Sequence, residues 1–83
     1  MVQLRDKVLL KRIAVVLKQL REKAGLVQAD VYADTNIHVG RIETARANLS
    51  VSTLSALCKF YKISLAEFFK KVEGLDARKI SSL

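Results

Sequence analysis

The segment from Asp6 to Ala24 constrains the fold of this chain more than any other, because its apolar residues recur at helical intervals. They stand three and four positions apart, which places them on one face of an α-helix. Gly25 follows directly, and glycine often ends helices because it adopts the left-handed conformation without strain. The sequence therefore predicts a long first helix that ends at Gly25. Its buried face is formed by Leu9, Ile13, Val16, Leu17 and Leu20.

Shorter helices are predicted after Gly25. Thr35 and Asn36 should break the second helix, since asparagine tolerates positive φ better than most residues. Ser50 is a suitable N-cap for a fourth helix, and Ser64 with Glu67 has the spacing of a capping box for a fifth. The predicted ranges are Gln28 to Asp34, His38 to Ala45, Ser50 to Phe60 and Ser64 to Val72. The positions expected to face inward are Val31, Tyr32, Val39, Ile42, Val51, Leu54, Leu57 and Cys58.

Length and composition indicate one compact all-α domain. The chain has 83 residues, contains no proline and only three glycines, and is 51% hydrophobic, which is too apolar for a disordered segment. We expect residues 1–12 to form an N-terminal extension and the start of the first helix. Residues 13–73 would form the domain itself, and residues 74–83 a C-terminal tail.

The sequence lacks the residues that several functional classes require. Cys58 is the only cysteine and His38 the only histidine, so neither an internal disulfide nor a metal site is expected. The sequence shows no paired acid and base and no phosphate-cradling loop, so we expect no catalytic residue, cofactor or small-molecule substrate. The longest apolar run, Ile13 to Leu17, is too short to span a membrane. We therefore expect a cytoplasmic protein.

The net charge of +7 favours a polyanionic partner such as nucleic acid. The excess of basic residues lies in residues 1–27 and 61–83, whereas basic and acidic residues balance in residues 28–60. Simple solubility is the other explanation for such a surface.

Several short motifs occur in a characteristic order along the predicted helices. Leu20-Arg21 precedes Gln28, Ile42-Glu43 ends the third helix, and Asn48-Leu49-Ser50 with Thr53-Leu54 begins the fourth. In this order they resemble the Cro and phage-repressor type, or XRE-type, helix-turn-helix family over roughly residues 13 to 69. The resemblance implies a five-helix, lambda-repressor-like DNA-binding domain with its helix-turn-helix at helices 2 and 3. It also implies a small bacterial or phage-type transcriptional regulator.

The resemblance assigns roles to individual residues. It makes Arg21 and Glu43 an internal ion pair between the first and third helices, and it places Gln28 at a DNA phosphate. Arg46 and Asn48 would contact the DNA backbone. With Val39 and Ile42 inward, the helical repeat leaves Arg41 and Thr44 facing outward, and Arg41 is the best candidate to read a guanine.

Two residues near the start of the third helix have open interpretations. His38 could cap that helix or donate to a phosphate. Gly40 could permit close approach to DNA, or it could belong to a short structural helix with no contact to bases. The third helix also departs from the family, because the span from Gln28 to Glu43 is about one helical turn shorter. Tyr32 stands where the family favours alanine, and the shortened helix would leave room for its ring.

Dimerisation and other partners complete the hypotheses. Phe68 and Phe69 are adjacent and cannot both point inward, so one of them, together with Val72, is a candidate for a homodimer contact on a two-half-site operator. A different reading is an antitoxin-like or scaffold module that keeps the fold but binds a protein. A third treats residues 8–20 as a basic amphipathic helix on a membrane surface. The resemblance favours double-stranded DNA.

Overall fold

The computed structural model describes residues 6–45 and 48–75, and in that part the regular structure is entirely helical. The helices are α1 (Lys7–Lys23), α2 (Gln28–Thr35), α3 (Val39–Glu43), α4 (Val51–Phe60) and α5 (Leu65–Glu73). The predicted all-α architecture of five helices is thus confirmed for these residues. Arg46 lies outside the described residues.

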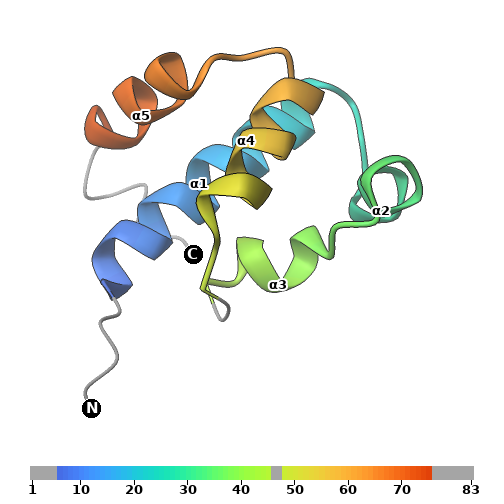
Figure 1. The fold of residues 1–83 in the computed structure, drawn as a ribbon, viewed down its shortest axis with the longest axis horizontal. Helices are drawn as coiled ribbons and strands as arrows, with labels where there is room; N and C mark the ends of the chain where they lie inside the picture. The colour runs from blue at the N-terminus through green and yellow to red at the C-terminus, as the bar shows by residue number, and fades with distance from the viewer. Residues whose placement is uncertain (1–5, 46–47, 76–83) are drawn as a thin grey trace.

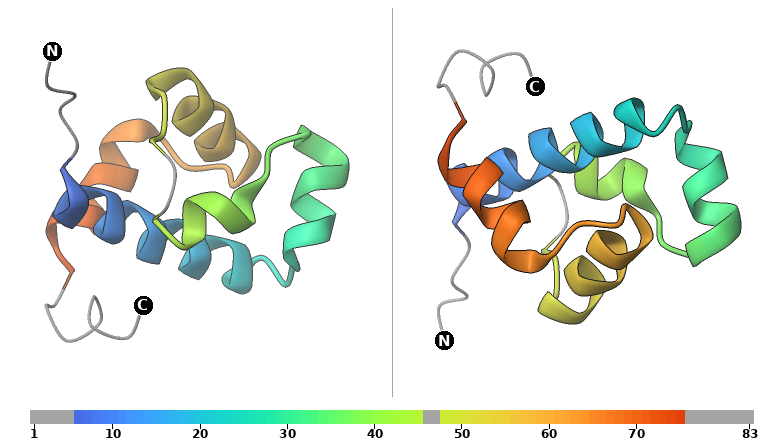
Figure 2. Two further views of the ribbon diagram at one scale, coloured as in Figure 1. Left: turned by 90° about the horizontal axis from the view of Figure 1, so that it is seen from below. Right: turned by 90° about the horizontal axis from the view of Figure 1, so that it is seen from above.

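α1 is the longest of the described helices (Figure 1). It contacts α3 and α5, while α2 contacts α3 and α4, and α4 contacts α5. The further views show α5 beside the N-terminal half of α1, α3 beside its C-terminal half, and α2 at the end of the molecule away from α5 (Figure 2). α2 and α3 are therefore neighbours, and both carry exposed residues.

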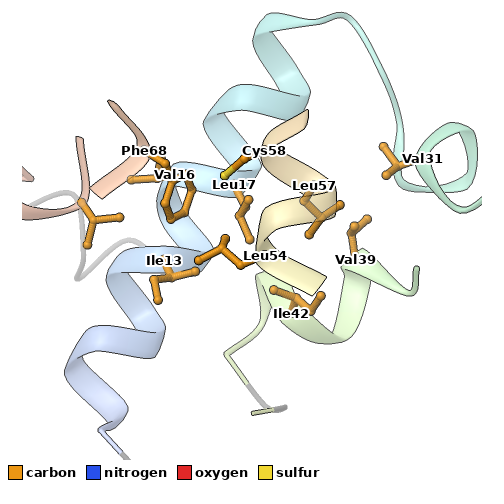
Figure 3. Close-up of a cluster of buried hydrophobic side chains, with 11 residues drawn as sticks. Ile13, Val16, Leu17, Val31, Val39, Ile42, Leu54, Leu57, Cys58 and Phe68 are labelled. Atoms are coloured by element: carbon orange, nitrogen blue, oxygen red, sulfur yellow. The ribbon is translucent and has the colours of Figure 1, made fainter. Parts of the chain in front are cut away.

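The hydrophobic core lies between α1, α4 and α5 and extends to α2 and α3 (Figure 3). Its largest fully buried side chain, Phe68, comes from α5. The short helices each contribute at least one buried residue, Val31 from α2 and Val39 with Ile42 from α3. The expected inward positions are confirmed with three exceptions. Leu9 in the first turn of α1 is 40% exposed, Tyr32 is 42% exposed, and Val51, the first residue of α4, is 74% exposed.

The end of α1 follows the residue that predicted it. Gly25 has φ +74°, and the amides of Gly25 and Leu26 donate to the carbonyls of Glu22 and Arg21 at 3.0 and 3.1 Å. These two bonds form a Schellman motif, which satisfies carbonyls that the helix itself leaves without partners. At the other end, Asp6 caps α1 by accepting from the Leu9 amide at 3.0 Å.

The caps of the other helices also follow from the sequence. Ser50 accepts from the Thr53 amide, and Ser64 accepts from the Glu67 amide, both at 3.0 Å. Val27 precedes α2 and its side chain has no acceptor, but the Asp30 carboxylate accepts from the Val27 amide at 2.9 Å. The acidic residue in the first turn thus supplies one half of a capping box, while the half that needs an N-cap side chain is missing.

The turn between α2 and α3 is stabilised by its own side chains. Asn36 has φ 60°, as its residue type predicted. The Thr35 hydroxyl donates to the Val31 carbonyl at 2.7 Å and accepts from the Ile37 amide at 3.1 Å. These bonds fix the chain direction at the point where it leaves α2.

α3 is shorter than the sequence indicated. We expected His38 to Ala45, but the helix spans Val39–Glu43 because Ala45 takes a left-handed φ of 58°. The His38 side chain makes no cap hydrogen bond, so the capping interpretation of this residue is wrong. A helix of five residues is not stable alone, so its position must come from contacts with the rest of the domain.

Candidate nucleic-acid interface

A buried ion pair holds the end of α3 against α1. Arg21 Nε donates to Glu43 Oε2 at 2.8 Å, and Arg21 Nη2 donates to Glu43 Oε1 at 3.0 Å. Arg21 is 8% exposed and Glu43 is 4% exposed. The structure thus brings together the two residues that the resemblance pairs. The hydrogen bond to Glu43 raises the pKa of Arg21 above its ordinary value, although burial acts in the opposite direction.

The same two side chains connect to the loop after α1 and to the start of α2. Arg21 Nη1 donates to the Leu26 carbonyl at 2.8 Å, and Gln28 Nε2 donates to Glu43 Oε1 at 3.1 Å. The pair is therefore the centre of a network that includes α1, the loop, α2 and α3. Both guanidinium and carboxylate have more than one partner, which compensates for their removal from water.

Tyr61, the C-cap residue of α4, lies in the electrostatic field of this network. Its hydroxyl is buried and has no hydrogen-bond partner among the described residues. Burial is the main cause that raises the pKa of Tyr61 to about 12; the charge of Glu43 contributes in the same direction, and Arg21 acts in the opposite direction. The hydroxyl is thus held in its neutral form.

Gly40 is close to a side chain of its own protein. A Cβ built at this position would lie 3.0 Å from Oε1 of Gln28, a tighter contact than most real Cβ atoms make. The Gln28 amide group would therefore have to shift by a few tenths of an ångström to accept a larger residue at this position. The proposed role of Gly40 in close approach to DNA remains a prediction.

Arg41 and Thr44 are both exposed at the surface of α3. The Thr44 hydroxyl donates to the Arg41 carbonyl at 3.0 Å, which satisfies one carbonyl at the C-terminal end of the helix. Asn48 is also exposed and begins the segment that leads into α4. The outward face predicted for α3 therefore corresponds to solvent-facing positions.

His38 and Tyr32 form an aromatic stack between α2 and α3. Their ring centroids are 4.4 Å apart and the ring planes differ by 29°. The stack borders an open hollow of about 410 Å³. The hollow is lined by Gln28, Ala29, Tyr32, His38, Val39, Gly40 and Arg41.

Four of the residues proposed from the sequence therefore meet at one hollow, namely Gln28, His38, Gly40 and Arg41. Tyr32 was missed as a surface residue because it was expected to point inward. Two features of the sequence indicated a surface position for Tyr32. Its large side chain stands where the family favours alanine, and the span from Gln28 to Glu43 is about one helical turn short.

The dimer candidates differ in their exposure. Phe68 and Val72 are 0% and 1% exposed, so both are core residues of the protomer. Neither has surface left for a subunit contact. Phe69 is partly buried and packs edge-on against Phe68, with centroids 5.4 Å apart. Only Phe69 of the three retains surface that a partner could cover.

Among residues 6–45 and 48–75, no group of three or more His, Cys, Asp and Glu side chains could hold a metal ion. In the same described ranges, the helices are too short or too polar to cross a membrane.

An all-helical domain that displays two short helices, joined by a tight turn, on one exposed face is a helix-turn-helix domain. A family model described as helix-turn-helix matches residues 17–68. This match covers more than half of the chain, so the chain belongs to the Cro and repressor-type, or XRE-type, helix-turn-helix family. The family identifies a protein of the DNA-binding, transcription-regulator type. No curated protein and no solved structure matches the chain.

Proposed function

We propose that this chain binds double-stranded DNA sequence-specifically as a small transcriptional regulator. The observation that carries the proposal is the exposed α2–α3 face, where Gln28, His38 and Arg41 border one hollow. Behind this face, buried contacts fix the position of α3, which is too short to hold itself. A rigid, exposed and partly basic helix is what base recognition requires.

Arg41, Thr44 and Gln28 each have a role in the proposal. Arg41 makes a bidentate contact with guanine O6 and N7, worth about 1 to 3 kcal/mol of discrimination. Thr44 lies next to it on the same surface. Gln28 and the backbone near the start of α2 contact a phosphate, and Asn48 with Arg46 contacts the backbone on the other side. The assignment of Arg46 rests on the resemblance alone.

The bond from Gln28 to Glu43 is compatible with a phosphate contact. An amide nitrogen carries two protons, and only one is needed for the bond to Glu43 Oε1. The remaining proton can be donated outward because Gln28 is exposed. The intramolecular bond then orients the side chain before DNA arrives.

The test is a binding measurement on a duplex selected from random sequences, followed by fluorescence anisotropy at several salt concentrations. The logarithm of the association constant should fall with the logarithm of salt at a slope of about −0.9 per neutralised phosphate. Arg41→Ala should weaken binding to the selected duplex by roughly 5- to 150-fold, the equivalent of the discrimination above. It should also reduce preference for that duplex over a scrambled one.

Lys70→Ala is the matched control. Lys70 is exposed in α5, which packs on α1 and α4. α5 lies beside the N-terminal half of α1 and away from α2 (Figure 2), so this charge is outside the proposed interface. If both variants lost the same affinity, Arg41 would act only through net charge and base reading by α3 would be excluded.

A homodimer on two half-sites about 34 Å apart is part of the proposal. The observation that supports it is apolar surface at the other end of the molecule. Val8 and Leu9 are 60% and 40% exposed. They line an open hollow of about 290 Å³ between the start of α1 and the end of α5, together with Asp6, Arg12, Val72 and Glu73. A second copy of the chain would bury Val8 and Leu9.

Light scattering after size-exclusion chromatography tests the dimer. Val8→Asp should shift the mass from dimer to monomer without unfolding the chain, since an acidic residue is favourable in the first turn of a helix. Val51→Asp, at the exposed first residue of α4, is the control and should leave the dimer intact. A wild-type chain that stays monomeric at high concentration would exclude the homodimer. The same apolar surface would then favour the second candidate, a module that binds a partner protein.

A further inference from the structure

The aromatic pair of Tyr32 and His38 has no role in the interface described so far. Tyr32 contributes little to the core, because 42% of the residue is exposed. Its ring lies against His38 instead, with centroids 4.4 Å apart. The two rings join the middle of α2 to the residue before α3, so each limits the motion of the other. An exposed, rigid ring pair is suited to contact with a ligand.

The position of the pair relates it to Arg41. Both rings and Arg41 line the same hollow of about 410 Å³, together with Gln28 at the start of α2. A duplex that brought a base edge to Arg41 and a phosphate to Gln28 would lie across this hollow. A base pair next to the one that Arg41 reads would then face the rings.

The lining of the hollow indicates which chemical group it accepts. Most of its surface is apolar, and the exposed residues of its lining include the two rings and Ala29. Such a surface is poorly suited to a phosphate, which needs several hydrogen-bond donors. The apolar group that a base pair presents in the major groove is the C5-methyl group of thymine.

We propose that Tyr32, positioned by His38, is a specificity-determining residue that contacts the C5-methyl group of a thymine beside the base read by Arg41. The inference rests on the proposed DNA-binding function and deepens it. In this arrangement α2 supplies an apolar base contact through Tyr32, next to the five-residue helix α3. His38 contributes as a positioning residue.

The expected effect is that of burying one methyl-sized group. Such burial corresponds to a roughly four-fold change in affinity. Replacing thymine with deoxyuridine removes only this methyl group and leaves every hydrogen-bonding atom of the base in place. One thymine in each half-site should therefore be sensitive, and replacing it in one half-site should weaken wild-type binding about four-fold.

The experiment uses the full chain and the selected duplex, with each thymine replaced in turn by deoxyuridine. Dissociation constants are measured for the wild type, Tyr32→Ala and Tyr32→Phe. The wild type should be sensitive at one thymine near the Arg41 contact, and Tyr32→Ala should lose that sensitivity. Tyr32→Phe should retain it, because the ring and not the hydroxyl makes the contact. Circular dichroism should show unchanged helicity, since alanine at a 42% exposed position leaves no buried cavity.

The outcomes separate this inference from the function on which it rests. A chain that binds no duplex would overturn both. Sequence-specific binding with the same deoxyuridine penalty in the wild type and in Tyr32→Ala would overturn the inference alone. So would a Tyr32→Ala variant that weakened binding to all duplexes equally, because the stack would then be a structural support and not a reader.

Discussion

Removing the carboxylate of Glu43 tests the central packing argument of the fold. In Glu43→Ala, the Arg21 guanidinium would lose both of its bonds to the carboxylate, at 2.8 and 3.0 Å, and would keep only its bond to the Leu26 carbonyl. Arg21 is only 8% exposed, so water cannot readily replace the lost partner. We expect the variant to be much less stable than the wild type.

The magnitude follows from the burial of the pair. Breaking a buried ion pair by removing one partner costs about 3 to 5 kcal/mol, because an uncompensated charge remains inside. The wild-type free energy of unfolding for a chain of 83 residues is expected at about 4 to 12 kcal/mol. Loss of Glu43 would therefore remove a large part of the stability. Because the pair is buried, added salt should change this loss very little.

Urea unfolding followed by circular dichroism measures the effect, with a lower midpoint and an unchanged slope as the expected result. Glu67→Ala, at an exposed position of α5, removes the same type of side chain and should change the free energy of unfolding by less than about 1 kcal/mol. The double variant Arg21→Met, Glu43→Leu should recover most of the loss, because two apolar residues leave no unpaired charge. If Glu43→Ala were as stable as Glu67→Ala, the pair would not hold α3 in place.

Three further predictions concern single residues of α4 and its C-terminal turn. In the wild type, the pKa of Tyr61 is raised to about 12, so its contribution to stability is fully present below pH 10 and is lost as pH rises toward 12. Urea unfolding of Tyr61→Phe should therefore show a smaller loss of stability over this pH range. At neutral pH, this variant should be as stable as the wild type or more stable, because the buried hydroxyl without a partner is removed. Lys62→Gly should raise the free energy of unfolding by about 0.5 to 1 kcal/mol in the same assay, because Lys62 has φ 60°. The thiol of Cys58 is buried, and burial raises its pKa. It should therefore react with a thiol-specific chromogenic reagent only when urea unfolds the chain. Rapid reaction of the native protein would contradict the packing of α4.

The fold could be predicted from the sequence wherever a residue type has one main conformational use. Gly25 marked the end of α1, and Ser50 and Ser64 marked the starts of α4 and α5. The end of α3 could not be predicted in this way. Ala45 carries no signal for a left-handed conformation, yet its φ of 58° ends the helix.

The candidate site was predictable in its composition but not in its internal contacts. Helical periodicity placed Arg41 and Thr44 on the exposed side of α3, as the structure shows. Periodicity could not show that the Gln28 side chain lies over Gly40, because that contact joins two helices. Tyr32 was misplaced for a related reason. An aromatic residue in a short helix is usually buried, and only the position of His38 shows that this ring stacks at the surface.

The shortness of α3 explains why its supports lie outside it. Five residues supply few hydrogen bonds of their own, so the orientation of Arg41 depends on Val39 and Ile42 in the core and on Glu43 in the buried pair. Substitutions at these three residues should therefore reduce stability and DNA affinity together. Arg41 is exposed and supports nothing behind it, so its substitution should reduce affinity alone. If core residues position the recognition helix and its exposed residues contact DNA, loss of stability and loss of affinity should be separable in this way.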